Sequence, residues 1–531
     1  MLYDDSWRFC YDVLTPEEMR RTEQKAFALG VPSLLLMEHA AIAVIDELEK
    51  ALGGSCKQKR VLFLCGTGNN GGDGLAAARL FAMRGGKPTV YLTGEPKTPD
   101  AKTNRVWAEK LGVPVLNLRE MPEKQLPFRE AGFAENFDGA VDALLGTGLR
   151  GEPDALTSGL IHAAASDFAR RKPVIAVDIP SGIDGTTGDA PGARISANVT
   201  VTFHAPKPGL YLTEKRDSVG KIVTADIGLW GMFDLQEMTY DPTCRVFAPP
   251  AIRLLHARKR TAHKGDSGRV LIYAGKLGMA GAAAMCAKAA VTAGAGLSTI
   301  ACEKEIIPIL QTLVPNAMCM DIQDAIKNPP ACDVFAVGCG LGQSEAIWQS
   351  ILRLWNPEKP SVWDADALNL LSRHEMKLRE NAVITPHPGE ASRLLGWPME
   401  KIMADRLETA RALAEKYGCT AVLKSDVTLI CKIEEGKPKY YLNTVGSPAL
   451  AKGGSGDALT GILAALLHDL GPMETLEQSA LACLWHGMAG VVGEEKYGQR
   501  ELTTDQLISC LHEAERWGRG EIPAPQTFQQ Y

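Results

Sequence analysis

Short apolar runs alternate with stretches of helical periodicity from about residue 15 to residue 226. Residues 60–65, 88–92, 139–145, 173–180 and 198–203 form five β-rich runs. Two helices precede these runs: the first begins at Pro16 after a capping Thr15, and the second covers 34–52. This alternation predicts a parallel sheet covered by helices on both faces, with ligand chemistry in the loops after the carboxyl ends of the strands.

The pattern lapses between about Ile227 and Arg260, around a proline pair and a basic cluster, and then restarts. Strand-like runs follow at 269–275, 334–340, 360–368, 381–390 and 420–426. A small-residue helix is expected within 279–296. Because 531 residues exceed what one hydrophobic core usually supports, the sequence predicts two α/β domains, at 1–235 and 245–520.

Composition narrows the classes of partner. A formal net charge of −6 gives no electrostatic case for nucleic acid or an anionic membrane, so we expect small-molecule partners. The 13 cysteines include no C-x-x-C pair and no zinc spacing, which is typical of reduced thiols in a cytoplasmic protein. The first residues lack the charge pattern of a signal peptide, and no apolar stretch reaches membrane-spanning length.

The first predicted strand runs directly into a glycine-rich loop, "GTGNNGGDG", at residues 66–74. This loop contains G-x-G-x-x-G, which is a weak signal when it stands alone. Asn69, Asn70 and Asp73 add amide and carboxylate groups to the glycines. Such a loop favours a hydroxylated or phosphorylated ligand and a cation held by oxygen atoms.

Polar residues also follow two later strands of the first half. Asp142 lies in one of these segments, and Asp178, Ser181 and Asp184 lie in the other. Together with Asn70 they offer hard oxygen ligands, which favour an alkali or alkaline-earth ion. Each residue alone could form a turn. Their common place at carboxyl strand ends favours a site.

A second glycine-rich stretch, "GGSGD", precedes the apolar helix expected at 458–470. The free N–H groups of such a helix start form an anion site that a phosphate can approach closely. Asp457 is either a general base or only a helix cap. Two other residues have a structural alternative: His387 could be a core histidine, and Lys424 a surface lysine at a strand end.

The loops at 66–74, 142–149 and 177–188 resemble the signature loops of the NAD(P)H-hydrate epimerase domain over nearly the whole first half. The resemblance implies a Rossmann-like three-layer fold that interconverts the R and S hydrates of reduced nicotinamide nucleotides. It implies potassium ligands at Asn70, Asp142 and Ser181. It implies substrate contacts at Asn69, Asn70, Gly71, Gly72, Asp73, Gly146, Thr147, Gly148, Leu149, Arg150, Gly151, Glu152 and Asp178.

Asp178 is the acid/base candidate, because epimerising a carbinol carbon beside an enamine requires proton transfer. The first half departs from the family pattern in "LMEHAA", where the family reads L-M-E-N-A-G. The departures are His39 and Ala41.

Residues 250–515 resemble the ADP/ATP-dependent NAD(P)H-hydrate dehydratase domain, a ribokinase-like three-layer α/β fold, through "VGCGLG", "ITPHPGE", "VLKSD" and "GGSGD". The resemblance implies substrate contacts at Ala282, Gly340, His387 and Asp457. It implies nucleotide contacts at Lys424, Ser425, Asp426, Val427, Thr428, Gly453, Gly454, Ser455 and Gly456. Asp457 would then be the base, and the loop amides would stabilise the transferring phosphoryl group.

Two details of the second half stay open. Asp364 and Asp366 are either associated with magnesium or turn residues at a strand end. "KSD" departs from the K-G that relatives often have at this place, which could alter the nucleotide preference.

The two resemblances imply a bifunctional repair enzyme that acts on NADHX and NADPHX. Its cofactors would be K⁺ in the first domain and Mg²⁺ with ADP or ATP in the second, and we expect a homo-oligomer. Dehydration would proceed by phosphorylation and elimination, since phosphate leaves more readily than hydroxide. The alternatives are a kinase of a small vitamin precursor or sugar, and a first half that only binds nucleotides or mediates assembly.

Overall fold

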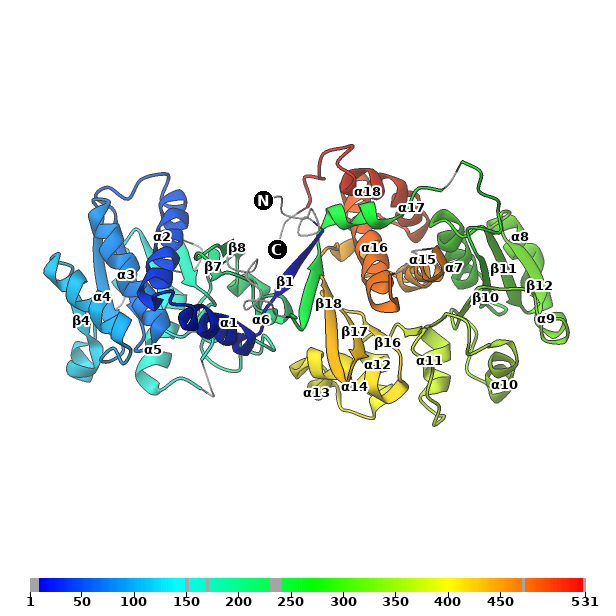
Figure 1. Cartoon of the computed structure of the whole chain (residues 1–531), viewed down its shortest axis with the longest axis horizontal. Coiled ribbons are helices and arrows are strands. Elements are labelled where there is room, and N and C mark those ends of the chain that lie inside the picture. Colours follow the sequence, from blue (N-terminus) through cyan, green and yellow to red (C-terminus); the bar gives the residue numbers. More distant parts are fainter. Residues whose placement is uncertain are drawn as a thin grey trace. The chain divides into compact units, whose positions relative to one another are not determined.

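The computed structural model describes residues 9–130, 132–148, 152–168, 171–229, 241–258, 260–469 and 473–528. It divides into two compact units (Figure 1). The N-terminal unit comprises described residues between 12 and 242. The C-terminal unit comprises those from 243 onward together with residues 9–11. The division falls close to the predicted junction near residue 240.

The N-terminal unit contains a parallel sheet in the order β4-β3-β2-β5-β6-β7-β8. Its strands are β2 (Arg60–Cys65), β3 (Lys87–Leu92), β4 (Val115–Asn117), β5 (Gly139–Ala143), β6 (Val174–Val177), β7 (Val199–Phe203) and β8 (Lys221–Ala225). The strand order reverses between β2 and β5. In an open parallel sheet the loops on either side of such a reversal diverge, which leaves a crevice at the carboxyl ends of the strands.

Helices cover both faces of this sheet, because its strands are apolar on both sides. They are α1 (Pro16–Ala28), α2 (Ser33–Ala51), α3 (Asn69–Met83), α4 (Pro99–Lys110), α5 (Ala155–Phe168) and the short α6 (Pro208–Leu212). Phe63 of β2 packs in one core with residues of α2 and α3, whereas Leu62 and Leu64 pack in another with residues of α5. The predicted helix start is confirmed: Thr15 caps α1 in a capping box with Glu18.

The C-terminal unit contains a larger sheet in the order β1-β9-β18-β17-β16-β15-β14-β13-β10-β11-β12. Its parallel strands are β10 (Arg269–Tyr273), β11 (Leu297–Cys302), β12 (Met318–Asp321), β13 (Val334–Val337), β14 (Ser361–Trp363), β15 (Ala382–Ile384) and β16 (Thr420–Leu423). An antiparallel hairpin, β17 (Thr428–Glu434) and β18 (Lys437–Asn443), follows β16. Here the parallel order reverses between β10 and β13, which marks a second crevice.

The first strand of the chain belongs to this second sheet. β1 (Cys10–Val13) neighbours β9 (Cys244–Phe247), and the N–H of Ala248 donates to the carbonyl of Phe9 at 2.9 Å. The sequence pattern predicts that the first domain begins at residue 1, and it shows only a lapse around β9. A four-residue strand has little pattern of its own, so its place depends on a partner far along the chain.

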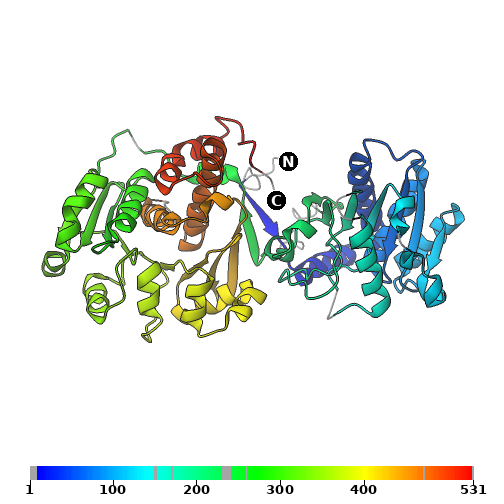
Figure 2. The same ribbon diagram turned by 180° about the vertical axis from the view of Figure 1, so that it is seen from behind.

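Helices also flank the second sheet on both faces (Figure 2). They are α7 (Ala280–Thr292), α8 (Ile307–Leu313), α9 (Ile322–Lys327), α10 (Glu345–Leu354), α11 (Ala365–Leu371), α12 (Pro388–Leu395), α13 (Met399–Ala404), α14 (Arg406–Tyr417), α15 (Ser455–Asp469), α16 (Thr475–Tyr497), α17 (Thr504–Ser509) and α18 (Leu511–Gly518). Two three-layer α/β units thus confirm the predicted fold class.

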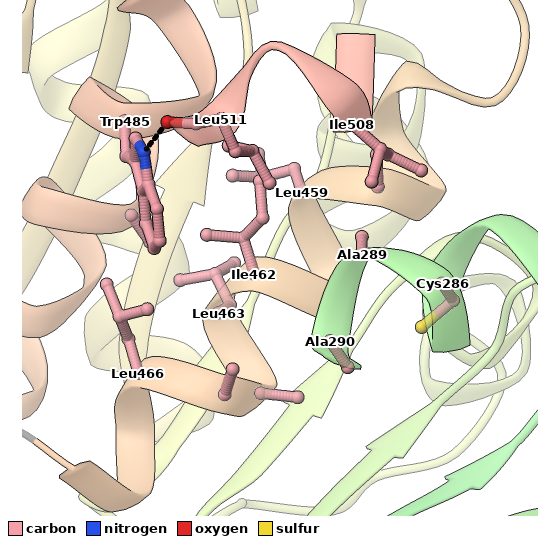
Figure 3. Close-up of a cluster of buried hydrophobic side chains, with 14 of the residues drawn as sticks. Cys286, Ala289, Ala290, Leu459, Ile462, Leu463, Leu466, Trp485, Ile508 and Leu511 are labelled. Carbon is pink, nitrogen blue, oxygen red and sulfur yellow. Dashed lines mark hydrogen bonds between the residues drawn. The ribbon is translucent and has the colours of Figure 1, made fainter. Parts of the chain in front are cut away.

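One apolar cluster fixes the helix that carries the second glycine loop. Figure 3 shows Leu459, Ile462 and Leu463 of α15 among side chains from α7, α16, α17 and α18. The helices α7 and α15 approach closely because Gly461 has no side chain: a Cβ there would lie 2.1 Å from the carbonyl oxygen of Cys286. The indole N–H of Trp485 donates to the Leu511 carbonyl at 2.9 Å. The helix α15 is therefore held in place by close packing against α7 and by the apolar cluster around it.

None of the helices in the described part of the chain is both long enough and apolar enough to cross a bilayer.

Two candidate active sites

The glycine loop after β2 needs glycine at two positions, one because the loop after β5 touches it and one because the loop folds back on itself. A Cβ on Gly66 would lie 1.9 Å from the carbonyl oxygen of Leu144, and one on Gly71 would lie 2.0 Å from that of Gly66. The helix α3 starts at Asn69, so Asn69, Asn70, Gly71, Gly72 and Asp73 form its first turns. Its N-terminal N–H groups lie at the first crevice, where they suit an anionic or polar ligand.

Asp142 and Ser181 meet at the carboxyl edge of the first sheet. Both are buried. The Ser181 N–H donates to Asp142 Oδ2 at 2.7 Å and its hydroxyl to Oδ1 at 2.6 Å, while the Leu144 N–H reaches Oδ1 at 3.3 Å. Burial raises the pKa of Asp142 to about 6, and these hydrogen bonds lower it only in part. No lysine or arginine is among these hydrogen-bond partners in the described structure.

Asn70 contacts the loop that follows Asp142. A Cβ on Gly146 would lie 3.0 Å from the Asn70 Cβ, so the loop after β5 packs directly on Asn70. The Asn70 Nδ2 is buried and has no hydrogen-bond partner among the described residues. The nitrogen and oxygen of a carboxamide exchange places by a simple rotation of the side chain, which lets it present Oδ1. A buried carboxyl with oxygen-bearing neighbours and an unpartnered amide fits a hard cation such as potassium.

Asp178 stands at the same edge, just after β6, in the left-handed region with φ 65°. Lys207, which is fully buried and follows β7, donates its ammonium group to Asp178 Oδ1. The hydroxyl of Thr202 donates to the same oxygen at 3.1 Å, and the N–H of Phe203 at 3.3 Å. Three donors thus fix Oδ1 of Asp178, and no donor to Oδ2 is present among the residues that the structure describes. A left-handed aspartate is strained backbone of the kind that clusters at functional sites.

Two further carboxyl groups face Asp178. The pKa of Glu23, on α1, is raised to about 7. Burial is the main cause and the negative charge of Asp178 adds to it, whereas the charges of Lys207 and Arg20 act in the opposite direction. Burial also raises the pKa of Asp73 well above its usual value, and Asp178 and Glu23 add to the effect. Sequence reasoning missed Glu23 and Lys207, because neither lies in a glycine-rich or strand-end motif.

Replacing Glu23 by glutamine is expected to remove a pH dependence of folding stability. In the wild type the folded state keeps the proton up to about pH 7, whereas the unfolded chain releases it near 4.5. Stability conferred by this carboxyl is therefore full below pH 4.5 and declines up to pH 7, by about 3 kcal/mol at most. Melting temperatures of wild type and Glu23→Gln at pH 5 and pH 8 check this. The melting temperature of the variant should rise relative to that of the wild type on going from pH 5 to pH 8. Parallel profiles would contradict it.

The remaining predicted contacts of the first site fall into three groups. Thr147 and Gly148 follow Gly146 in the loop after β5, and Glu152 is exposed beyond it. Leu149, Arg150 and Gly151 lie outside the described residues. The departures from the family pattern are accounted for by packing: His39 Nδ1 lies 3.0 Å from the Ile227 carbonyl oxygen, and Ala41 is fully buried in the core.

Ala282 and Gly340 come together at the second crevice. Ala282 lies in the first turn of α7, after β10, and Gly340 follows β13 with φ +63°. A Cβ on Gly340 would lie 3.0 Å from the Ala282 Cβ. The loops on the two sides of the strand-order reversal therefore contact each other through these two residues.

Asp457 lies in the first turn of α15, as predicted from the sequence. Burial raises its pKa to about 6, with a further rise from the charge of Asp364; a hydrogen bond from the Cys339 thiol and the charge of Lys424 act in the opposite direction. The carboxylate thus contacts a group from the loop after β13. Its contact with that loop brings Asp457 to the same crevice as Gly340.

Lys424 and Asp364 form an ion pair beneath the glycine loop. Lys424 Nζ donates to Asp364 Oδ1 at 2.7 Å, and the Thr460 hydroxyl donates to Oδ2 at 2.8 Å. A Cβ on Gly456 would lie 3.5 Å from Lys424 Nζ. The lysine therefore lies next to the loop, where its positive charge suits a phosphate ligand.

The two aspartates left open by the sequence both serve the protein's own structure. Each oxygen of Asp364 accepts from a side chain, as described above. Asp366 accepts from the Gly342 N–H at 2.7 Å and from the Gln343 side-chain amide at 2.8 Å. These bonds are compatible with the turn interpretation, and association with magnesium stays a prediction.

His387 is the N-cap of α12 and not a core residue, since its side chain is 52% exposed. Its Nδ1 accepts from the Gly389 N–H at 3.0 Å. Burial of the rest of the ring, with the charges of Lys424 and Arg393, lowers the pKa of His387. A neutral ring with Nδ1 as acceptor carries its hydrogen on Nε2, which is the donor available to a ligand.

The nucleotide segment from Lys424 to Thr428 connects β16 to β17. Arg406, buried on α14, donates to Ser425 Oγ at 2.8 Å and to Asp426 Oδ1 at 2.6 Å. Arg406 thereby fixes the "KSD" stretch that departs from the family pattern. Val427 is buried and Thr428 begins β17.

The two halves of the chain match known families. Residues 270–513 match the family described as NAD(P)H-hydrate dehydratase, and residues 33–209 match the YjeF-related protein N-terminus. A bifunctional NAD(P)H-hydrate repair enzyme of Escherichia coli is 37% identical over 501 residues, which cover 93% of this chain and 92% of the relative. The chain belongs to the family of bifunctional NAD(P)H-hydrate repair enzymes. Other relatives with this name come from Coxiella burnetii (36% identical; 93% of this chain and 97% of the relative) and Leishmania braziliensis (32%; 94% and 92%).

Among solved structures, an ADP/ATP-dependent NAD(P)H-hydrate dehydratase from Bacillus subtilis, co-crystallised with ATP and Mg²⁺, is 27% identical. It covers 51% of this chain and 97% of its own, with a TM-score of 0.46. The repair-enzyme relatives thus span both units of this chain.

Proposed function

We propose that this chain repairs hydrated nicotinamide nucleotides with two separate activities. The N-terminal unit interconverts the R and S hydrates of NADH and NADPH, and the C-terminal unit dehydrates the S hydrate with ADP or ATP. The observation that carries the proposal is the match to bifunctional relatives over both units. Each unit also has a glycine loop and a carboxyl group, buried in Asp142 and half-buried in Asp457, with a raised pKa at the crevice of a parallel sheet.

In the epimerase, the hydroxyl on ring carbon 6 leaves and returns on the opposite face. The ring nitrogen lone pair expels this hydroxyl as water once an acid has protonated it, and water re-adds with loss of a proton to a base. Asp178 and Glu23 are the two groups we assign to this proton transfer, because they lie close enough for the charge of Asp178 to raise the pKa of Glu23. Lys207 orients Asp178. Asn70, Asp142 and Ser181 would hold a potassium ion, which supplies positive charge to the site.

In the dehydratase, Asp457 takes the proton of the substrate hydroxyl while that oxygen attacks the terminal phosphoryl group of the nucleotide. The bond from this phosphorus to the bridging oxygen breaks, and ATP leaves as ADP, or ADP as AMP. The N–H groups of the loop 453–456 stabilise the charge on the transferring group. The ring nitrogen then expels phosphate by cleavage of the bond between carbon 6 and oxygen. Loss of a proton from carbon 5 completes the double bond of NAD(P)H. Mg²⁺ bound to the nucleotide would neutralise phosphate charge.

Substrate and nucleotide contacts follow from the same placement. His387 offers its Nε2–H to the hydrate, and Ala282 and Gly340 line the crevice beside Asp457. Lys424, with its pKa raised by the ion pair with Asp364 despite burial, remains charged beside the phosphates.

An assay with separated R and S hydrates tests the proposal. With ATP or ADP, Mg²⁺ and K⁺, the protein should convert both epimers fully to NAD(P)H, faster than they interconvert unaided. Without nucleotide it should only equilibrate them. Chiral chromatography and absorbance of the dihydronicotinamide measure both steps. Accumulation of a phosphorylated product without NAD(P)H would instead indicate a kinase.

A further inference from the structure

Two buried side chains that belong to none of the sequence motifs described above contact the carbonyl groups of the glycine loop at 453–456. Thr504, the first residue of α17, donates its hydroxyl to the Gly453 carbonyl oxygen at 3.1 Å. His486, on α16, places Nε2 3.1 Å from the carbonyl oxygen of Ser455 and 3.2 Å from its hydroxyl oxygen. Their exposed fractions are only 5% and 8%.

These contacts dictate where the N–H groups of the loop point. In a trans peptide unit the C=O of one residue and the N–H of the next point in opposite directions. The carbonyl of Gly453 points to Thr504, so the N–H of Gly454 points away from α17. The carbonyl of Ser455 points to His486, so the N–H of Gly456 points away from α16.

The carbonyl between these two is satisfied as well, since Gly454 accepts from the Ala458 N–H at 3.0 Å. Gly454 itself, at φ +95°, must be glycine: a Cβ would lie 2.9 Å from Thr504 Oγ1 and 2.3 Å from Met285 Sδ. The missing side chain is what lets Thr504 reach the loop. All three consecutive carbonyls thus have donors, and none is left to turn towards an anionic ligand.

We propose that Thr504 and His486 are positioning residues that aim the N–H groups of Gly454 and Gly456 at the transferring phosphoryl group. This inference rests on the proposed dehydration at the same site. It explains how a flexible glycine loop becomes a preorganised anion site, which is the condition for strong stabilisation of developing charge.

The role of His486 is that of a neutral donor. Burial, with the charge of Lys424, lowers its pKa to about 4. A carbonyl oxygen only accepts, so Nε2 must carry the hydrogen. The hydrogen bond consequently persists over the whole range in which the dehydratase would work, and a charge on His486 is not part of the mechanism.

Thr504→Val is the decisive variant, because it keeps the shape and removes only the hydroxyl. We expect a fall in the dehydration kcat of about tenfold, with little change in the KM for the S hydrate. Affinity for ATP should fall about three- to tenfold, the usual effect of one lost hydrogen bond, while affinity for adenosine stays unchanged. Thr504→Ser should restore both values. His486→Phe should act like Thr504→Val, and His486→Gln, which keeps an N–H donor, should be milder.

Thr409→Val is the matched control. Thr409 is also fully buried and donates to a carbonyl, that of Ile402 at 3.1 Å, but away from the loop. It should leave kcat within about twofold. The melting temperature and far-ultraviolet circular dichroism of each variant report that the C-terminal unit is folded, and epimerase activity is the control for the N-terminal unit.

Two results would overturn the inference: kcat and ATP affinity of Thr504→Val within twofold of wild type, or equal losses of ATP and adenosine affinity. A wild type that binds ATP but does not dehydrate the S hydrate would overturn the proposed function instead. The comparison of ATP with adenosine then still decides whether Thr504 and His486 shape an anion site.

Discussion

Asp457→Asn is expected to lower the rate of nucleotide-dependent dehydration by about two to four orders of magnitude, the usual effect of losing a general base. An amide cannot take the proton of the substrate hydroxyl. Asparagine caps a helix about as well as aspartate, so a capping role predicts retained activity. The two roles are therefore separated by one isosteric change at the start of α15.

The pH profile adds a second test of the same residue. Asp457 must be ionised to act as the base, and its pKa lies at about 6. Wild-type kcat/KM should therefore fall as the pH decreases through 6, and the small residual rate of Asp457→Asn should lack that limb. Melting temperature, ATP binding and epimerase activity of the variant should stay near wild type. A variant that still dehydrates at more than about a tenth of the normal rate would contradict the role of base.

Asp142→Ala is expected to abolish most epimerisation and leave dehydration of the S hydrate nearly intact. The change removes a carboxyl group that accepts three hydrogen bonds and that we assign to potassium. With a racemic hydrate and ATP, wild type should consume both epimers, whereas the variant should stall near half. Chiral analysis of the remaining hydrate should show only the R form.

Potassium dependence sharpens this test. Because the pKa of Asp142 is about 6, a cation competes with a proton for the carboxylate, and activation by potassium should weaken as the pH decreases through 6. Asp142→Asn, which keeps the shape of the side chain, should lose activation at every pH. Equal loss of epimerase and dehydratase activities would refute two independent sites.

Local sequence was sufficient for much of this architecture. The β-rich runs became strands, Thr15 became a cap, and Asp142 and Ser181 met at one sheet edge because the carboxyl ends of parallel strands share that edge. Clusters of glycine marked both loops in the sequence.

The remaining parts of the sites depend on the folded chain. Glu23 lies on an amphipathic helix and His486 on a largely apolar one, and in the sequence each resembles any other residue of its helix. Lys207 follows a strand, but its burial against Asp178 depends on how neighbouring strands end. Such residues act through tertiary contacts, for which a single sequence carries no local signal.

The pairing of β1 with β9 determines how early in synthesis the first strand can fold. Cys10 leaves the ribosome 234 residues before Cys244, the first residue of β9. At about 5–20 residues per second, the first strand waits roughly 10 to 50 s for its neighbour. Meanwhile its backbone N–H and C=O groups form an unpaired edge, which invites association between nascent chains. Its shortness, four residues with Asp12 among them, limits that hazard. The first strand therefore pairs with β9 only after the C-terminal half of the chain has begun to emerge from the ribosome.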